Sequence, residues 1–386
     1  MDNRKITVIQ IGHRNSYLIA LSVFELSKLD MLITDYYPSR MELGLANLVN
    51  RFWPSVRWPK KILVRNYSEL PRENILSIFT LVSFSLFKLI PYHFYIRFFF
   101  YLVNIVARKN TILLVLSEAP VLFKNRTDQV KILESVLSAK RDLEVYSRSL
   151  FVNSKFLKIK EELFKIENES IGYADKLLVP SLFLSDLNRI YYNKESYVIP
   201  YYSKQIVNDS RTSFVDRDVR SYLFVGRISV VKGVDLIVEI FRGLSLSKFN
   251  CTLVGPLEDA CLVEDLPSNV RYLGFKNGNE LRSIYLSHDF FLFPTLNEGS
   301  ALVVYEALGF GMPVITTEYA GSILETGKCG KLISPDRKSI LDAINDFNHL
   351  TIAQYQTLSA GAIEIIKQHT VDVYKSRVKD FLKKGT

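Results

Sequence analysis

Two carboxylates, eight residues apart, flank the start of one predicted helix. Glu298 precedes the helix expected over Ser300–Phe310, and Glu306 lies about two turns after it. Eight residues advance a helix by roughly 800°, about 80° beyond two full turns, so both carboxylates could reach one ligand from two sides. Because a carboxylate only accepts hydrogen bonds, such a pair suits the vicinal hydroxyls of a sugar or ribose. By itself, however, the pair also fits one glutamate that complements the helix dipole and one that is solvated.

The turn before this helix predicts an anion site. A strand expected over Asp289–Phe293 leads into it, and Gly299 would let the backbone approach a ligand closely. Unpaired amides at a helix start, together with the helix dipole, favour an anion such as a diphosphate. The amides expected to point at the ligand are those of Gly299, Ser300, Ala301 and Leu302.

A second loop of the same kind follows the strand expected over Ser221–Val225. Gly226 ends this strand, and Arg227 and Lys232 place two cations before a helix that begins near Gly233. Each cation could form charge-assisted hydrogen bonds to phosphate oxygens, worth roughly 1.5–3 kcal/mol apiece. Either cation alone fits a solvated turn. Two such loops at strand ends of one sheet favour a phosphate site.

These motifs resemble the nucleotide-sugar domain of the retaining GT-B glycosyltransferases of family 4. The matching features are, in order, Gly226-Arg227 with Lys232-Gly233, then Val254-Gly255-Pro256 with Tyr272-Leu273-Gly274, and finally Glu298 to Glu306 with Gly311-Met312-Pro313-Val314-Ile315. The resemblance covers about Tyr173 to Ala343. Before that, only the alternation of strands and helices agrees.

The resemblance implies a role for each motif. Arg227 and Lys232 would hold the donor diphosphate and stabilise the leaving group without a metal or other cofactor. Glu298 would contact the sugar hydroxyls, and Glu306 would bind the ribose. The donor would be a UDP- or GDP-sugar, with its base against the loops after Val254 and Leu273. The acceptor would be a sugar or a lipid-linked molecule, and transfer would retain the anomeric configuration.

The acceptor side is weakly marked in the sequence. The family's first strand usually leads into a glycine-rich loop, whereas here only Gly12 is present, followed by His13. His13 is a candidate for the histidine that the family often places near the donor sugar, although a lone loop histidine is more often solvated. Glu118, after the strand expected over Thr111–Leu116, is a similar candidate.

The elements that must position these residues alternate between short strands and helices along the whole chain. This pattern is typical of βα units on parallel sheets, so we expect an α/β fold with two Rossmann-like domains facing across a cleft. Residues 1–203 would form the acceptor domain and residues 204–369 the nucleotide-sugar domain, joined by a polar linker over Pro200–Arg220. The resemblance implies that the last helix, over 370–386, crosses back to the first domain. A helix is expected over Val121–Leu137.

Composition fits a globular enzyme of two domains. The chain has 386 residues, 48% of them apolar, and its three widely spaced cysteines exclude a disulfide framework and a zinc site. The formal charge is +9, and residues 51–110 carry ten Lys or Arg against two acids. Because aromatic residues are dense there, an anionic membrane surface is a better match than nucleic acid. A core helix pair with solvated charges is the alternative. Five phenylalanines are expected to be buried: Phe84, Phe87, Phe98, Phe99 and Phe100.

No segment supplies the roughly 20 clean apolar residues of a membrane span, and the first strand is too short for a signal peptide. We therefore expect a cytoplasmic enzyme, peripheral on the inner face of the membrane. The predicted function is a retaining hexosyltransferase of bacterial surface polysaccharide or glycolipid assembly. The alternatives are a nucleotide-sugar epimerase or phosphorylase of the same fold and a non-catalytic, membrane-associated relative.

Overall fold

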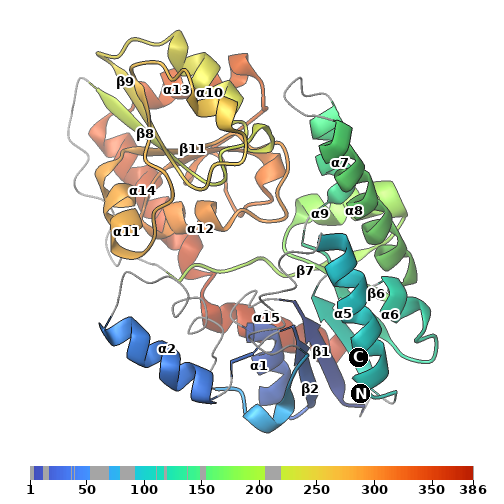
Figure 1. Cartoon of the computed structure of the whole chain (residues 1–386). Helices are drawn as coiled ribbons and strands as arrows, with labels where there is room; N and C mark the ends of the chain where they lie inside the picture. Colours follow the sequence, from blue (N-terminus) through green and yellow to red (C-terminus); the bar gives the residue numbers. More distant parts are fainter. Residues whose placement is uncertain are drawn as a thin grey trace.

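The chain forms two parallel β-sheets, each with helices against it (Figure 1). The computed structural model describes residues 4–11, 17–35, 37–38, 40–52, 69–78, 92–109, 111–116, 120–136, 138–147, 154–204 and 219–385. The first sheet is built from residues before the predicted boundary at 204 and the second from residues after it. The exact boundary stays a prediction, and most of the predicted linker lies outside the described residues.

The first sheet has seven strands in the order β3-β2-β1-β4-β5-β6-β7. Its direction of winding reverses between the neighbouring strands β1 and β4, which pair in parallel from Ile6 with Ile112 to Gln10 with Leu116. The strands are β1 Ile6–Gln10, β2 Leu29–Thr34, β3 Ile75–Ser77, β4 Ile112–Leu116, β5 Lys131–Glu134, β6 Lys176–Val179 and β7 Ser196–Val198. The helices are α1 Leu18–Glu25, α2 Arg40–Phe52, α5 Tyr92–Val106, α6 Pro120–Lys124, α7 Ala139–Ser147, α8 Ser154–Tyr173 and α9 Leu182–Tyr192, with a 3-10 turn at Arg72–Asn74.

The second sheet has six strands in the order β10-β9-β8-β11-β12-β13, with its reversal between β8 and β11. The strands are β8 Arg220–Val225, β9 Phe249–Val254, β10 Val270–Tyr272, β11 Phe290–Phe293, β12 Val314–Thr317 and β13 Gly330–Ile333. The helices are α10 Val234–Arg242, α11 Gly278–Ser287, α12 Leu302–Gly309, α13 Arg337–Asn348 and α14 Ile352–Lys367, with 3-10 turns η3 Val230–Lys232, η4 Ala260–Val263 and η5 Glu318–Ala320. A continuous apolar core fills this domain from Tyr222 to Ile366.

The last helix, α15 (Val371–Gly385), returns to the first domain as predicted and lies beside α1 (Figure 1). Phe381 and Leu382 are buried in the same core as the first-domain strands β1 and β4. Glu25 of α1 forms ion pairs with Lys375 and Lys379 of α15. The end of the chain therefore belongs to the fold of its beginning.

The helix predicted over Val121–Leu137 is wrong. This segment holds the short helix α6 and then the strand β5, whose residues Lys131–Glu134 are all buried. Successive residues of a strand point to opposite faces of the sheet, so burial of all four residues means that both faces of β5 are covered, which removes the alternation that would have marked it as a strand. The strands β3 and β13 and the helices α7 and α9 were also not predicted.

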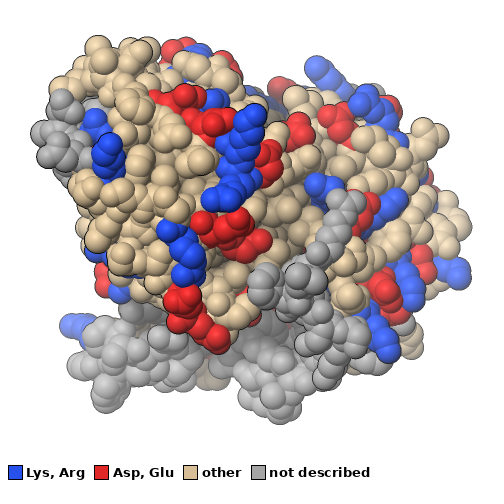
Figure 2. Space-filling model, turned by 90° about the horizontal axis from the view of Figure 1, so that it is seen from above, with Lys and Arg blue, Asp and Glu red and all other residues tan. Residues whose placement is uncertain are grey.

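The basic and aromatic stretch, residues 51–110, contains the helix α5, which has a buried side and an exposed side. Phe99 and Phe100 are buried in the first-domain core, as predicted, but Phe98 is exposed. Phe84 and Phe87 lie outside the described residues. On the face seen in Figure 2, basic and acidic side chains alternate and form no single-sign patch among the described residues.

Candidate functional site

The two predicted phosphate loops follow β8 and β11, the adjacent strands at which the second sheet reverses its winding. Ligands of open α/β sheets bind at the carboxyl ends of such strands. The structure brings Lys232 of the first loop and Glu298 of the second together, with 2.7 Å between Nζ and Oε1. Lys232 Nζ also donates a hydrogen bond to the carbonyl oxygen of Asn297 at 2.9 Å. Its side chain is only 3% exposed, so this cation is fixed in place.

The two loops form one unit because their backbones are bonded to each other. The carbonyl oxygen of Val231 accepts hydrogen bonds from the amide of Leu296 at 2.8 Å and from Thr295 Oγ1 at 3.1 Å. Gly233 has a φ of +70°, and a Cβ there would lie 2.2 Å from the carbonyl oxygen of Pro294. Only glycine allows both this backbone conformation and this close approach.

Gly226 stands where the strand meets this site, as predicted. Its amide donates to the carbonyl oxygen of Val254, and its own carbonyl oxygen would lie 1.7 Å from a Cβ on Gly255. The glycines of two predicted motifs therefore pack against each other. Their roles toward a donor stay predictions.

Arg227 has a partner that the sequence did not reveal. Its Nη1 lies 2.9 Å from Oε2 of Glu258, and Tyr146 of α7 donates a hydrogen bond to Glu258 Oε1 at 3.3 Å. The Arg227 side chain is 48% exposed, so it remains accessible to a ligand. Burial, with the charge of Glu258 beside it, raises the pKa of Tyr146, which keeps its hydroxyl protonated as the donor. The sequence signal that could have indicated this partner of Arg227 is the position of Glu258 just after the motif Val254-Gly255-Pro256.

Glu306 lies on α12 and is held by Tyr285 of α11, whose hydroxyl donates to Glu306 Oε2 at 3.0 Å. Burial raises the pKa of the Glu306 carboxyl above its ordinary value, and the Tyr285 hydrogen bond opposes this rise. Burial likewise raises the pKa of Tyr285. The carboxylate is therefore oriented by a fixed donor.

The helix start differs from the prediction in one respect. Helix α12 begins at Leu302, and the amide of Ala301 donates to the carbonyl oxygen of Ala320 at 2.8 Å. The Ala301 amide is thus not one of the free donors expected at this position. The Ser300 hydroxyl lies 3.0 Å from the hydroxyl of Tyr305, and Leu302 is exposed.

Gly299 makes a close approach, but its neighbour in this structure is the first domain. A Cβ on Gly299 would lie 1.7 Å from the carbonyl oxygen of Val136, just after β5. The carbonyl oxygen of Gly299 accepts a hydrogen bond from Ser181 Oγ at 2.5 Å. The loop that carries Glu298 therefore packs directly on the first domain.

The predicted first-domain candidates Gly12, His13 and Glu118 lie outside the described residues. The segments that hold them follow β1 and β4, the adjacent strands where the first sheet reverses its winding. Their roles stay predictions.

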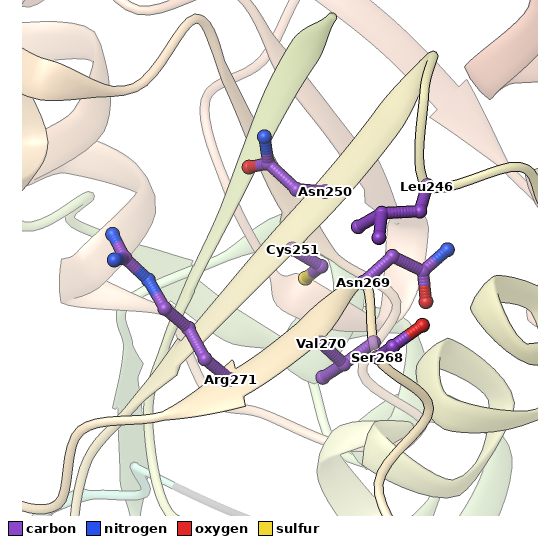
Figure 3. Close-up of a pocket in the computed structure, with 7 residues that line it drawn as sticks. All are labelled: Leu246, Asn250, Cys251, Ser268, Asn269, Val270 and Arg271. Atoms are coloured by element: carbon purple, nitrogen blue, oxygen red, sulfur yellow. The ribbon is translucent and has the colours of Figure 1, made fainter.

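Figure 3 shows a pocket of about 280 Å³ elsewhere in the second domain. Asn250 and Cys251 of β9 and Asn269 and Val270 at the start of β10 line it. These residues are at the amino ends of their strands, whereas the phosphate loops follow carboxyl ends. The pocket is therefore separate from the candidate donor site.

Among the described residues, no helix has the length and apolar character needed to cross a membrane. Within the same part of the chain, no group of three or more His, Cys, Asp or Glu side chains is placed to hold a metal ion.

Residues 208–362, about two fifths of the chain, match the family model described as glycosyl transferases group 1. The uncharacterized glycosyltransferase MJ1607 of Methanocaldococcus jannaschii is 31% identical over 123 residues, 30% of this chain and 31% of that protein. A GDP-mannose-dependent alpha-mannosyltransferase of Mycobacterium tuberculosis is 31% identical over 33% of this chain and 31% of its own length. The capsular polysaccharide biosynthesis glycosyltransferase CapM of Staphylococcus aureus is 30% identical, over 31% and 34%. The alignments span about a third of these relatives.

Solved structures match over nearly the whole chain. Sucrose-phosphate synthase from Thermosynechococcus elongatus has a TM-score of 0.67 at 15% identity and covers 99% of both chains. WaaG, a glycosyltransferase involved in lipopolysaccharide biosynthesis, has a TM-score of 0.60 at 14% identity and covers 97% of this chain and 99% of its own. At these identities the likeness shows the fold, and it confirms the predicted GT-B architecture of two Rossmann-like domains.

Proposed function

We propose that this protein is a retaining glycosyltransferase that moves a sugar from a nucleotide-diphosphate sugar to an acceptor. The observation that carries the proposal is the buried Lys232 ammonium, held between Glu298 and the Asn297 carbonyl where two sheet-end loops meet. Arg227 adds a second, exposed cation on the same loop. The match of residues 208–362 to glycosyl transferases group 1 supports this proposal.

Each site residue would have a separate role in the transfer. When the bond between the anomeric carbon and the diphosphate oxygen breaks, negative charge develops on the leaving diphosphate. Arg227 and Lys232 would stabilise this charge from fixed positions, which costs little reorganisation during the reaction. Glu298 would accept hydrogen bonds from the sugar hydroxyls and Glu306 from the ribose. The base is proposed to be uracil or guanine.

The proposal also covers the metal requirement of the transfer and the biological role of the protein. Because the two cations supply positive charge at the diphosphate, we propose that transfer needs no metal, and a chelator should leave its rate unchanged. The names of CapM and WaaG support a role in bacterial surface polysaccharide or glycolipid assembly. The acceptor is then a sugar or a lipid-linked sugar.

The test is donor binding to variants of the two cations. Arg227→Ala and Lys232→Ala should each weaken the binding of UDP or GDP by about 10- to 150-fold, since each loses a charge-assisted bond of roughly 1.5–3 kcal/mol. Calorimetry measures the affinity. Arg227 is the safer position, because it is half exposed and its loss leaves no buried charge unpaired.

The matched control is Lys331→Ala, a partly exposed lysine of β13 that pairs with Asp346 in the same domain. It should bind as the unaltered protein does. Binding of neither UDP nor GDP by the unaltered protein would remove the proposal. A new sugar isomer formed from the UDP-sugar alone would favour the epimerase instead.

We also propose that the α5 side of the first domain contacts an anionic membrane. Tyr101 and Ile105 of α5 are 58% and 65% exposed, and Arg108 and Lys109 follow the helix. Exposed aromatic and aliphatic side chains beside basic ones suit the headgroup region.

Binding of the protein to vesicles tests this contact. Sedimentation with phosphatidylglycerol vesicles should decrease with added salt, and replacing both Tyr101 and Ile105 by Ser should weaken it severalfold. The control is Ile352→Ser, an exposed position at the start of α14 in the second domain. Equal binding to neutral vesicles at any salt concentration would contradict the proposal.

A further inference from the structure

Helix α7 of the first domain lies against both phosphate loops of the second. Its residues Val145 and Tyr146 share an apolar cluster with Val231 of the first loop and Leu296 of the second. Arg141 of the same helix donates from Nε to the carbonyl oxygen of Leu296 at 3.4 Å. The two domains are thus joined at the site itself.

The centre of this contact is a buried polar group drawn from both domains. Asn297 Nδ2 donates to Asp142 Oδ1 at 2.7 Å and to the carbonyl oxygen of Ser138 at 2.9 Å. Lys160 of α8 pairs with the other oxygen, Oδ2, of Asp142 at 2.8 Å. Asn297 is fully buried and Asp142 nearly so. Because a buried carboxylate needs partners, one oxygen of Asp142 takes a cation from its own domain and the other an amide from the opposite domain.

Asn297 connects this group to the proposed donor site by a single residue. Its side chain is bonded to the first domain, and its carbonyl oxygen accepts the hydrogen bond from Lys232 Nζ. The next residue, Glu298, pairs with the same ammonium. A shift of Asn297 would therefore move two of the groups that face the donor.

We propose that Asp142, held by Lys160, is a positioning residue that sets Lys232 and Glu298 through Asn297 across the contact between the two domains. This inference rests on the function proposed for those two residues. Arg227 is held by Glu258 and not through Asn297, so it continues to bind a diphosphate when the Asp142–Asn297 bond is lost. Transfer needs both cations and Glu298 in place as charge develops on the diphosphate, so turnover should depend on the Asp142–Asn297 bond more than binding does.

A charge exchange across the contact tests the proposal. Asn297→Asp places a carboxylate against Asp142, and the repulsion should lower kcat at least tenfold, by a larger factor than it weakens the binding of UDP or GDP. Release of UDP from UDP-glucose or of GDP from GDP-mannose reports the rate, and calorimetry reports the affinity. The double variant Asp142→Asn with Asn297→Asp restores a donor and an acceptor between these two positions but not the bond to the Ser138 carbonyl or the charge partner of Lys160, so it should recover part of the lost kcat.

A second test of the same variants needs no substrate. Small-angle scattering should show a larger radius of gyration for Asn297→Asp than for the unaltered protein, and a return toward the original value in the double variant. The control is Asn345→Asp on α13, the same chemical change at an exposed position, which should alter neither quantity.

The outcomes separate the two proposals. If the unaltered protein binds neither UDP nor GDP, the proposed function fails and this inference falls with it. If it binds and turns over donor but Asn297→Asp keeps its kcat, only the positioning role is wrong. A purely structural contact would lower the melting temperature and leave kcat intact, which also overturns the role.

Discussion

At the scale of single residues, the site is a set of charges that are already paired. Lys232 is matched by Glu298 and Arg227 by Glu258, so neither cation faces the donor region alone. Because a buried, uncompensated charge is costly, such pairing is what allows Lys232 to be buried at all. A diphosphate would meet cations whose positions are set before it arrives, which is the arrangement that electrostatic stabilisation of a leaving group requires.

Glu306 gives a prediction at this scale. Burial raises the pKa of Glu306, so its carboxylate takes up a proton at a higher pH than an ordinary glutamate does and then loses an acceptor site proposed to bind the ribose. The affinity for UDP or GDP should therefore fall as pH is lowered through this raised pKa, by up to about tenfold per pH unit. Calorimetry across a pH series measures it.

The ligand's own phosphate also titrates, so a comparison of variants is decisive. The affinity of Glu306→Gln for UDP or GDP should be lower than that of the unaltered protein at neutral pH. The ratio of the two affinities should approach one at acidic pH. Glu280→Gln, at an exposed position of the neighbouring helix α11, should follow the unaltered protein throughout. A constant ratio for Glu306→Gln would contradict the prediction.

At the scale of elements, the two strand-to-helix connections of the second sheet act as one unit. Backbone hydrogen bonds to the carbonyl oxygen of Val231 fix the β11 loop to η3, and Gly233 makes their contact sterically possible. Helix α10 begins directly after this unit, with Asp235 in its first turn. Rigid connections of this kind hold the proposed ligand groups without support from the ligand.

Asp235 gives a prediction for α10. Burial raises its pKa to about 6, against an ordinary value of 3.8, with Glu239 and Asp259 adding to the rise. The protonated form is favoured by folding, so its stabilising contribution is complete below about 3.8 and is lost as pH rises through about 6. Asp235→Asn should therefore raise the melting temperature at pH 7–8 by a few degrees, and little at pH 4.

The size of this effect follows from the shift. About two pKa units correspond to roughly 3 kcal/mol as an upper limit. Asp342→Asn, on an exposed position of α13, is the control and should leave the melting temperature unchanged at both pH values. A lower melting temperature for Asp235→Asn at pH 8 would show that the charged form is the stabilising one.

At the scale of the whole molecule, the two domains are joined at several places. These include the contact of α7 with the phosphate loops, the packing of Gly299 on Val136 and Ser181, and the return of α15 to the first domain. The chain passes between the domains where the amide of Ser203 donates to the carbonyl oxygen of His369 at 3.0 Å. The two segments that connect the domains therefore meet at this hydrogen bond.

The α15 tie gives a prediction for the folding of the first domain. Phe381 is buried in the first-domain core and lies 4.9 Å, between ring centroids, from Tyr197 of β7. Phe381→Ala should destabilise this domain by about 3–5 kcal/mol, because it removes a buried ring and leaves a cavity. Calorimetric unfolding measures it, with the exposed Lys383→Ala as the control. An unchanged unfolding transition for Phe381→Ala would mean that α15 is not part of that core.

The sequence alone predicted most of the second domain, with the strand β13 as an exception. Its strands, its loop glycines and the acidic pair Glu298 and Glu306 lie within short segments whose order and spacing are local properties. The strand-helix alternation also predicted two parallel sheets, and the family resemblance implied the return of the last helix. The prediction failed at β5, because a strand that is buried on both faces has no alternation of apolar and polar residues.

Only the tertiary structure decided which residues are partners. Glu258 is 31 residues from Arg227, Tyr285 is 21 from Glu306, and Asp142 is 155 from Asn297. The same holds for Gly299, whose close neighbour is the carbonyl oxygen of Val136 in the first domain. Such contacts depend on how strands are ordered within a sheet and how the domains meet. Neither the strand order nor the contact between the domains appears as a periodic pattern in the sequence, because the path of the backbone determines which distant residues a side chain contacts.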